Sequence, residues 1–503
     1  MRYSLALLLW LACTSVLAQV QSIGYEALSA PDWIMHRQSD SLHTSLRPFN
    51  RGLEQQYFVA LDSSYSVDSY TSGIEVFPTG GLQLGGQIAD EQRPIGLSSI
   101  GIGAEYHHED RLYLSANYTP VLSAPSENYR LLGDSLSIIP GAGWANSSGD
   151  FFLSHVVQGR FVWNAPKFFS LEAGQGKQFW GDGYRSLILS QNSAPFPYLR
   201  ISTDVWKIKY TNLWAQMRDV TGATKWSDAR KKYTSMHALS WQAHPKLNVT
   251  FYEMVVWQDR DSLSKRSLDL DYLNPIIFFR PVEFAQGSAD NVLIGMSWKW
   301  KMSRNSHAYG QLMFDEFLLF ELRRRSGWWA NKFGIQIGMR NFNFLTEGLH
   351  TQNEINFVRP FTYTHGSVLQ AFGHVNQGLA HPMGTNFLEW VNIWRLEREN
   401  WYVSQKFIWG IYGRDIGDDN FGGNVFRSYR NPSFQYGNEV AQGLKSTFHW
   451  EEVTYGRRFS KKQDLWGFAS AALRFERNDH IQRVDFMLNV GVRTSLFPSY
   501  RDF

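Results

Sequence analysis

The sequence predicts an all-β protein, a transmembrane antiparallel β-barrel of about 16–18 strands with internal plug loops or short helices. Three observations lead to this prediction. Aromatic residues make up 16% of the chain, and the chain also has 41 Gly. Many segments alternate apolar and polar residues with a period of two, as strands with two different faces do. No apolar run after the N-terminal segment has the length of a transmembrane helix.

The N-terminal segment has the pattern of a secretory signal peptide. Arg2 provides the positive charge, residues 5–11 form a short apolar core, and Ala18 is a small residue suited to cleavage. The only cysteine, Cys13, lies inside this segment, so cleavage after Ala18 leaves no disulfide and no thiolate ligand. Cleavage before Cys13, as in a lipoprotein, is the alternative. We expect a signal peptide at residues 1–18, an irregular periplasmic arm at 19–57 and an outer-membrane barrel at 58–503.

The alternating segments favour a barrel in a membrane over a soluble sandwich or propeller. In residues 483–493, Val, Phe and Leu alternate with Arg, Asp, Asn and Gly, and residues 401–411 have an apolar face that Gln405 interrupts. Trp and Tyr often stand at the ends of such faces, as in the aromatic girdles of membrane barrels. Phe503 resembles the terminal aromatic residue that outer-membrane barrels commonly carry. Only a closed barrel lets strands cross lipid without unpaired backbone groups.

Within residues 174–200 (GQGKQFWGDGYRSLILSQNSAPFPYLR), a connection from about Gly176 to Tyr198 joins two predicted strands and is too long for a hairpin turn. Their aromatic and aliphatic side chains, such as Trp180 and Tyr184, are costly to leave in water. Gly181, Gly183 and Pro195 favour sharp turns over a loose tether. We therefore predict a folded plug inside the space that the strands enclose.

Two local motifs are interpreted as chance matches. Residues 133–136 (GDSL) match a block of lipases, but no later Asp-x-x-His supplies a base for Ser135, which we expect in a polar turn. Residues 415–424 are acidic and Gly-rich, but their order does not match an EF-hand, so a solvated extracellular turn is favoured over a calcium site.

Charged residues in aromatic or Gly-rich surroundings have two interpretations. A pair of carboxylates could cleave glycosides, whereas a lumen network of paired charges is the structural alternative. Basic and aromatic residues together could recognise an acidic polysaccharide, but for residues 323–329 we favour an interfacial girdle. The carboxylates concerned are Asp182, Glu283, Asp315, Glu316, Glu389, Glu451 and Glu452, and the basic or aromatic residues include Lys177, Trp180, Tyr184, Arg185, Arg200 and Arg280.

An ordered series of motifs resembles the capsule assembly Wzi family over roughly residues 100 to 500. Residues 180–183 (WGDG), 186–192 (SLILSQN) and Pro195 match its W-G-x-G, S-L-I-L-S-x-N and Pro-containing turn. The run 380–387 (AHPMGTNF) with Glu389 is similar to the form in Bacteroidota close to the RemB gliding-motility proteins. The blocks between them are Asn274-Pro275, Arg280-Pro281-Val282-Glu283, Asp290-Asn291, Tyr309-Gly310-Gln311 and Asp315-Glu316.

The resemblance implies an outer-membrane barrel of about 18 strands that binds surface or capsular polysaccharide without catalysis, in capsule assembly or in gliding and adhesion. Phe179 and Asp182 depart from the family, which often has Trp and Pro there, and this bears on polysaccharide specificity. A porin-like diffusion channel and an outer-membrane glycosidase are the alternatives. The residues expected to bind polysaccharide or to form the scaffold of the lumen are Trp180, Asp182, Tyr184, Arg185, Asn192, Arg200, Arg280, Glu283, Asn291, Gln311, Asp315, Glu316, His381, Asn386 and Glu389.

Charge and composition limit the partners. Cleavage would leave 49 − 1 = 48 basic residues against 46 acidic ones, a balance that is no signature of nucleic-acid binding. We expect polysaccharide and outer-membrane lipid as partners, with a gliding or secretion machinery in the motility case. No cofactor and no metal are expected.

Overall fold

The computed structural model describes residues 43–48, 73–89, 92–109, 111–165, 168–260, 266, 269, 271–275, 290–460, 465–494 and 502. The predicted signal peptide, most of the predicted arm, Arg280, Glu283 and Phe503 lie outside these residues. Among the described residues, no helix is long and apolar enough to cross a membrane.

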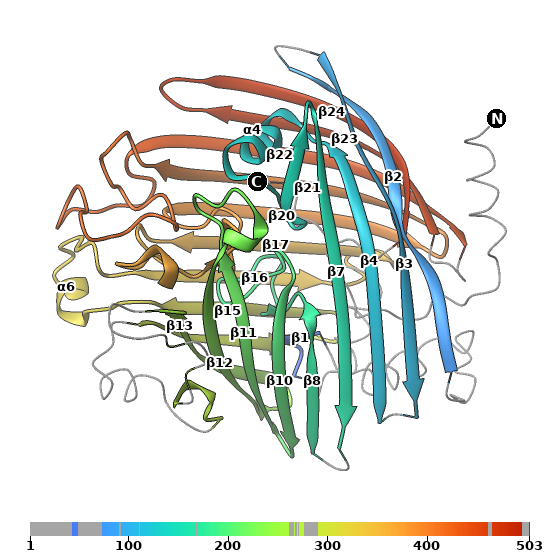
Figure 1. Cartoon of the computed structure of the whole chain (residues 1–503), viewed down its shortest axis with the longest axis horizontal. Helices are drawn as coiled ribbons and strands as arrows, with labels where there is room; N and C mark the ends of the chain where they lie inside the picture. Colours follow the sequence, from blue (N-terminus) through green and yellow to red (C-terminus); the bar gives the residue numbers. More distant parts are fainter. Residues whose placement is uncertain are drawn as a thin grey trace.

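The predicted fold is confirmed: 18 antiparallel strands form a closed barrel (Figure 1). Closure is made by the last strand, which pairs with the first, with Leu84 opposite Val490. The barrel strands are β2 (Gly73–Ile88), β3 (Gln92–His108), β4 (Leu112–Ala124), β7 (Phe151–Asn164), β8 (Phe169–Gly176), β10 (Phe196–Val205), β11 (Ile208–Asp219), β12 (Arg230–His244), β13 (Leu247–Gln258), β14 (Asn291–Lys301), β15 (Ser306–Phe314), β16 (Phe333–Asn341), β17 (Leu349–Val358), β20 (Phe387–Arg398), β21 (Trp401–Arg414), β22 (Leu444–Ser460), β23 (Leu465–Arg477) and β24 (Gln482–Thr494).

Shorter elements lie in the connections and in the lumen. The helices are α4 (Glu127–Leu136) and α6 (Leu319–Arg323), and short 3-10 turns span Trp226–Asp228, Asp271–Leu273 and Val368–Gln370. The small strands are β1 (Leu46–Arg47), β5 (Ile138–Ile139), β6 (Gly143–Ser148), β9 (Phe179–Trp180), β18 (Gly373–His374) and β19 (Gln377–Gly378).

The two faces of each barrel strand differ as the alternation predicts. On β24, Leu488 and Val490 are more than half exposed on the outside, whereas Asp485 is buried on the inside. Apolar residues at the outer positions suit contact with lipid, and the closed ladder leaves no strand edge unpaired. The barrel therefore spans an outer membrane.

The two ends of the barrel have different connections. At one end the turns are short: β10 ends at Val205 and β11 begins at Ile208. Long connections at the other end join β15 to β16, β17 to β20 and β21 to β22. Outer-membrane barrels have short periplasmic turns and longer extracellular loops, so the long connections mark the cell surface. Exposed tryptophans near the turn end, as in an interfacial girdle, are Trp163, Trp206, Trp241 and Trp300.

Residues 177–195, the plug, fold back from the loop end into the barrel. Trp180 pairs with Leu46 of β1, so β9 and β1 form a small sheet inside the lumen (Figure 1). The described residues of the predicted arm therefore lie within the barrel. Leu187, Ile188 and Leu189 of the plug are fully buried in a core shared with the barrel wall. Sequence composition alone predicted this internal plug.

Candidate functional site

Two glycines give the plug its tight turn. Gly181 has a φ of +147°, a backbone conformation that residues with a Cβ rarely adopt. A Cβ on Gly183 would lie 2.5 Å from Oε2 of Glu354 and 2.6 Å from the backbone O of Arg185. Backbone geometry and close approach to the wall therefore require both glycines of the W-G-D-G motif.

Trp180 and Gln311 hold the turn against the wall. The Trp180 ring is fully buried and stacks on Tyr252 of β13, with ring centroids 5.8 Å apart. The backbone N–H of Trp180 donates to Leu189 O at 2.8 Å. Gln311 Nε2 donates to Trp180 O at 3.0 Å, while its Oε1 accepts from Leu187 N at 2.7 Å. One side chain of β15 thus bonds two points of the plug backbone.

Glu354 of β17 is a second wall contact, which sequence analysis missed. Its Oε2 accepts the backbone N–H of Tyr184 at 2.7 Å, and its Oε1 accepts that of Arg185 at 3.0 Å. Tyr309 Oη donates to Oε2 at 2.8 Å, and Asn356 Nδ2 donates to Oε1 at 2.9 Å. These four donors satisfy the carboxylate without a cation.

Arg185 carries a buried charge in the centre of the plug. Its Nη2 lies 3.1 Å from Glu389 Oε1 and 2.9 Å from Asp502 Oδ1, and all three side chains are almost fully buried. Asp502 also accepts from Lys406 Nζ at 2.8 Å and from the Tyr184 hydroxyl. We call Arg185, Glu389, Asp502 and Lys406 the ion cluster. Its charges are paired, as buried charges must be.

The ion cluster determines which groups carry protons. Burial acts to raise the pKa of the Asp502 carboxyl, but Arg185 and Lys406 outweigh it and hold that pKa well below its usual range. Burial and the charge of Asp502 hold the pKa of the Tyr184 hydroxyl well above its usual value. Tyr184 therefore stays neutral, and its hydroxyl donates a hydrogen bond to the Asp502 carboxylate.

His381 orients Glu389 from the loop between β17 and β20. Its Nε2 lies 2.8 Å from Glu389 Oε2, and its Nδ1 accepts the backbone N–H of Met383 at 3.1 Å. Burial lowers the pKa of His381 despite the adjacent carboxylate, so the ring is neutral. A neutral imidazole has one donor and one acceptor, which puts the proton on Nε2.

The structure brings Trp180, Tyr184, Arg185, Gln311, His381 and Glu389 of the predicted set together, and it distributes the others around the barrel. Asp182 and Asn192 hold the plug to neighbouring segments, whereas the remaining described residues belong to separate groups. Their bonds are Asp182 with Thr44 (2.5 Å), Asn192 with Gly378 O (3.1 Å), Arg200 with Glu172 (2.5 Å), Asn291 with Gln370 O (2.9 Å), Asn386 with Gly413 O (3.1 Å), Asp315 with Lys332 (3.0 Å) and Glu316 with Lys332 (3.2 Å).

The carboxylates considered for glycoside cleavage do not share an open site. Glu389 is 0% exposed and is already bound by Arg185 and His381. Glu452 faces the lumen and pairs with Lys406 at 3.2 Å. Glu451, its neighbour along β22, points to the opposite, outer face of the barrel. The arrangement supports the lumen network of paired charges over a catalytic pair.

The two chance motifs have structural roles. Ser135 lies in the last turn of α4, not in the polar turn that we expected, because the GDSL block continues the helix; its Oγ donates to Leu131 O at 2.7 Å. In residues 415–424, Arg427 pairs with Asp415 at 3.2 Å and donates to Asp419 O at 3.0 Å. A guanidinium thus takes up a carboxylate oxygen and a backbone carbonyl of this segment, and no cluster of potential metal ligands is found among the described residues.

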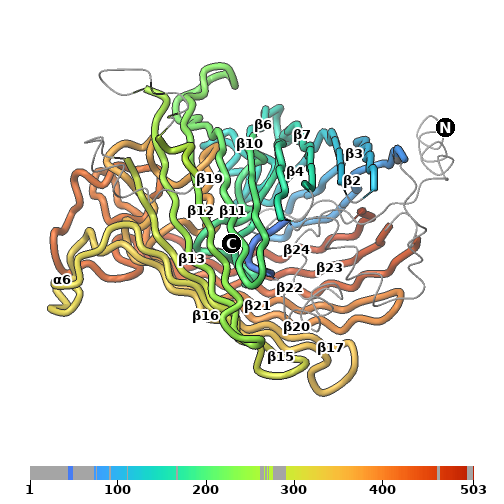
Figure 2. The backbone as a smooth tube through the Cα atoms, turned by 90° about the horizontal axis from the view of Figure 1, so that it is seen from below, coloured from blue at the N-terminus to red at the C-terminus, as the bar shows by residue number. Residues whose placement is uncertain are grey.

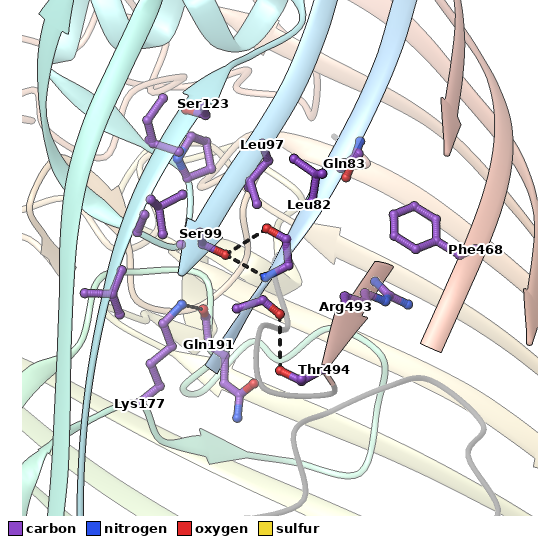
Figure 3. A pocket seen from close by; sticks show the side chains of 18 of the residues that line it. Leu82, Gln83, Leu97, Ser99, Ser123, Lys177, Gln191, Phe468, Arg493 and Thr494 are labelled. Carbon is purple, nitrogen blue, oxygen red and sulfur yellow. Dashed lines mark hydrogen bonds between the residues drawn. The ribbon is translucent and has the colours of Figure 1, made fainter. Parts of the chain in front are cut away.

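A cavity of about 460 Å³ lies in the lumen between the plug and the wall formed by β2–β8 and β20–β24. Figure 3 shows Lys177 and Gln191 of the plug on one side of the cavity and Arg493 and Phe468 on the other. Lys177 Nζ donates to Gln191 O at 3.1 Å. The plug therefore fills only part of the lumen.

Comparisons with known proteins support the fold. No family model and no curated protein matches the sequence. Among solved structures, Wzi, an outer-membrane protein involved in group 1 capsule assembly in Escherichia coli and described as a carbohydrate-binding β-barrel, matches with a TM-score of 0.55 and 11% identity, over 92% of this chain and 97% of that chain. The Wzi-like fold that the motifs implied is confirmed, whereas the RemB type stays a prediction.

Two porin structures are more distant. OccAB4 of Acinetobacter baumannii has a TM-score of 0.45 and 8% identity, over 85% of this chain and 99% of that chain. OprD of Pseudomonas aeruginosa has a TM-score of 0.44 and 10% identity, over 83% and 93%. The TM-scores of these two structures are too low to support any argument about function. The chain is an outer-membrane β-barrel with a Wzi-like fold.

Replacing Arg185 by Met should weaken the attachment of the plug to the wall. Removal of the guanidinium leaves Glu389 without a cation and Asp502 with Lys406 alone, and breaking a buried ion pair costs about 3–5 kcal/mol. We expect a lower unfolding temperature in detergent and faster proteolysis within residues 177–195. Lys177→Met is the matched control, because Lys177 bonds only a backbone carbonyl among the described residues. Equal behaviour of the two variants would contradict the anchoring role.

Asp502 should make stability depend on acid pH. Its pKa is lower in the folded chain than in the unfolded chain, so its contribution is complete above the unfolded value of about 4 and is lost as the pH falls toward the folded value. Asp502→Asn should reduce stability at pH 7 and flatten the loss of stability between about pH 5 and pH 2. Thermal unfolding across this range measures the effect. The exposed Asp479→Asn serves as control, and an unchanged pH profile in Asp502→Asn would refute the assignment.

Proposed function

We propose that this protein is a non-enzymatic outer-membrane barrel that binds or retains surface polysaccharide, in capsule assembly or in gliding and surface adhesion. The observation that carries the proposal is an aromatic surface on the long loops. Phe434 and Tyr436, between β21 and β22, are both more than half exposed. Aromatic faces stack on the apolar faces of sugar rings. These two rings lie at the end of the barrel that faces the cell exterior.

The loops that carry this surface are joined to each other by their backbones. Trp329 N donates to Gln435 O at 3.1 Å, and Gly437 N donates to Ser326 O at 2.8 Å. Trp329 packs on Tyr429, with ring centroids 5.0 Å apart, so it helps to hold the two loops together. Figures 1 and 2 both draw α6 and the loop after β21 at the same end of the barrel. Ordered rings lose little conformational entropy on binding.

The plug supports the long loops from inside the barrel. Tyr363, in the loop between β17 and β20, donates its hydroxyl to Leu187 O at 2.8 Å. The plug in turn donates to the same loop, because Ser190 N donates to Leu379 O at 2.7 Å. Trp180, Arg185 and the other residues of the anchored plug would then act as scaffold, and direct sugar contacts would belong to the loop surface.

The aromatic surface should be required for binding. We expect the purified, detergent-folded protein to bind the surface polysaccharide of the producing strain saturably. Phe434→Ala with Tyr436→Ala should weaken binding about tenfold, since loss of stacking at about 1.4 kcal/mol corresponds to that factor. Trp206→Ala, which removes an exposed ring at the turn end, is the control. Equal binding by both variants would refute the site, and release of reducing ends would indicate the glycosidase alternative.

A diffusion channel is the second candidate, and the lumenal cavity is the observation that favours it. Arg493 and Lys177 line the cavity and would select anions if the cavity conducts. Arg493→Glu should then shift the reversal potential of single channels toward cation selectivity. The measurement uses the folded protein in planar bilayers under a salt gradient. Absence of conductance in the unaltered protein would remove this candidate.

A further inference from the structure

A row of polar side chains lies on the outer, lipid-facing surface of the barrel. The outer positions next to this row include the apolar Ile355, Trp390 and Val453, and each of these three is more than a third exposed. On the inner face of the same strands, the buried Glu354 contacts the plug and the partly buried Lys406 pairs with Asp502. The members of this outer polar row are Asn353, Asn392, Gln405, His449 and Glu451.

The outer polar row follows about the same level of the wall across the four strands, and Phe407 of β21 stands within it. Asn353 is paired with Asn392, Asn392 with Phe407, and Phe407 with Glu451 in the strand register. Asn392 Nδ2 donates to Asn353 Oδ1 at 2.6 Å, and Gln405 Nε2 donates to Glu451 Oε1 at 2.9 Å. The row therefore contains two hydrogen-bonded pairs, Asn353 with Asn392 and Gln405 with Glu451, on the same outer surface.

The location of the outer polar row on the barrel is unfavourable in lipid. Asn353, Asn392 and Glu451 lie near the midpoints of β17, β20 and β22, so they face the hydrocarbon region of the membrane. Ionisable and amide groups on the lipid face of a barrel cost most at that depth, because lipid chains offer no hydrogen bonds. Another molecule that covers these residues would supply the hydrogen-bond partners that lipid chains lack.

The same chain covers another outward-facing polar site with its own residues. His237 on β12 points outward but is only 5% exposed. Next to it, Tyr210 Oη donates to Pro275 O at 2.7 Å, and Trp214 Nε1 donates to Tyr272 O at 3.0 Å, so residues 271–275 lie against the outside of the wall. Within the described ranges, no segment of the chain crosses the outer polar row in this way.

We propose that the outer polar row is an intramembrane contact surface for a second copy of this chain. Two copies inserted in the same direction are related by a two-fold axis along the membrane normal, and such an axis keeps every residue at its own depth. The polar row of one copy thus meets the row of the other. The row is also self-complementary: among the described residues, Asn353 Nδ2 has no acceptor and Asn392 Oδ1 has no donor, and each amide both donates and accepts. Amide hydrogen bonds between chains stabilise contacts inside membranes.

The predicted mature chain has no cysteine, which permits a direct test. Asn392→Cys and Asn353→Cys, made singly, should each form a covalent dimer of twice the monomer mass when outer membranes of the producing cells are oxidised with copper–phenanthroline. Val157→Cys is the matched control: it is lipid-facing near the midpoint of β7, on the far side of the barrel. Heat-dependent migration on gels verifies that each variant is folded.

The outcomes are distinct. A covalent dimer from either row variant and none from Val157→Cys supports the proposal. Monomers alone from both folded row variants, or adducts with a different protein, would overturn it. In the Asn353→Cys background, Gln405→Leu with Glu451→Leu should abolish the covalent dimer if the polar row holds the copies together. Undiminished cross-linking there would also reject the role of the row.

Discussion

The guanidinium of Arg185 connects the plug to two distant parts of the chain. It lies within ion-pair distance of Glu389 on β20 and of Asp502 near the C-terminus. A cation buried this deeply is stable only with its carboxylates in place, and the carboxylates are equally dependent on the cation. Plug, barrel wall and C-terminal residues therefore stabilise one another, and the position of the plug follows from this constraint.

The inner face of the barrel wall provides polar partners for the plug, whereas the outer face provides apolar side chains for contact with lipid. Glu354 and Gln311 bind the backbone of the plug, where a porin wall would face water. Because peptide groups cannot be buried without partners, an irregular segment inside a barrel requires a polar wall of this kind. The loops in turn rest on the plug through Tyr363 and Ser190. A rigid aromatic surface at the cell exterior is the consequence.

Sequence reasoning reached the fold and the plug but only part of the site. Alternation in residues 483–493 identified a two-faced strand, and the glycines around Trp180 identified a folded turn. Glu354 and Asp502 carried no local signal, since each is one charged residue among many. Ser135 was expected in a polar turn, yet the whole GDSL block lies within α4. The orientation of Glu451 away from the lumen was also missed.

Sequence patterns alone revealed strands such as residues 483–493, the apolar face of each, and the need of the apolar side chains in residues 177–195 to be buried. These properties are local, because a period of two needs only neighbouring residues. The contacts of Arg185 with Glu389 and Asp502, and the pairing of Asn353 with Asn392 on the lipid face, became visible only in the folded barrel. Such contacts depend on strand register and barrel closure, which join residues far apart in the chain, and no local pattern specifies them.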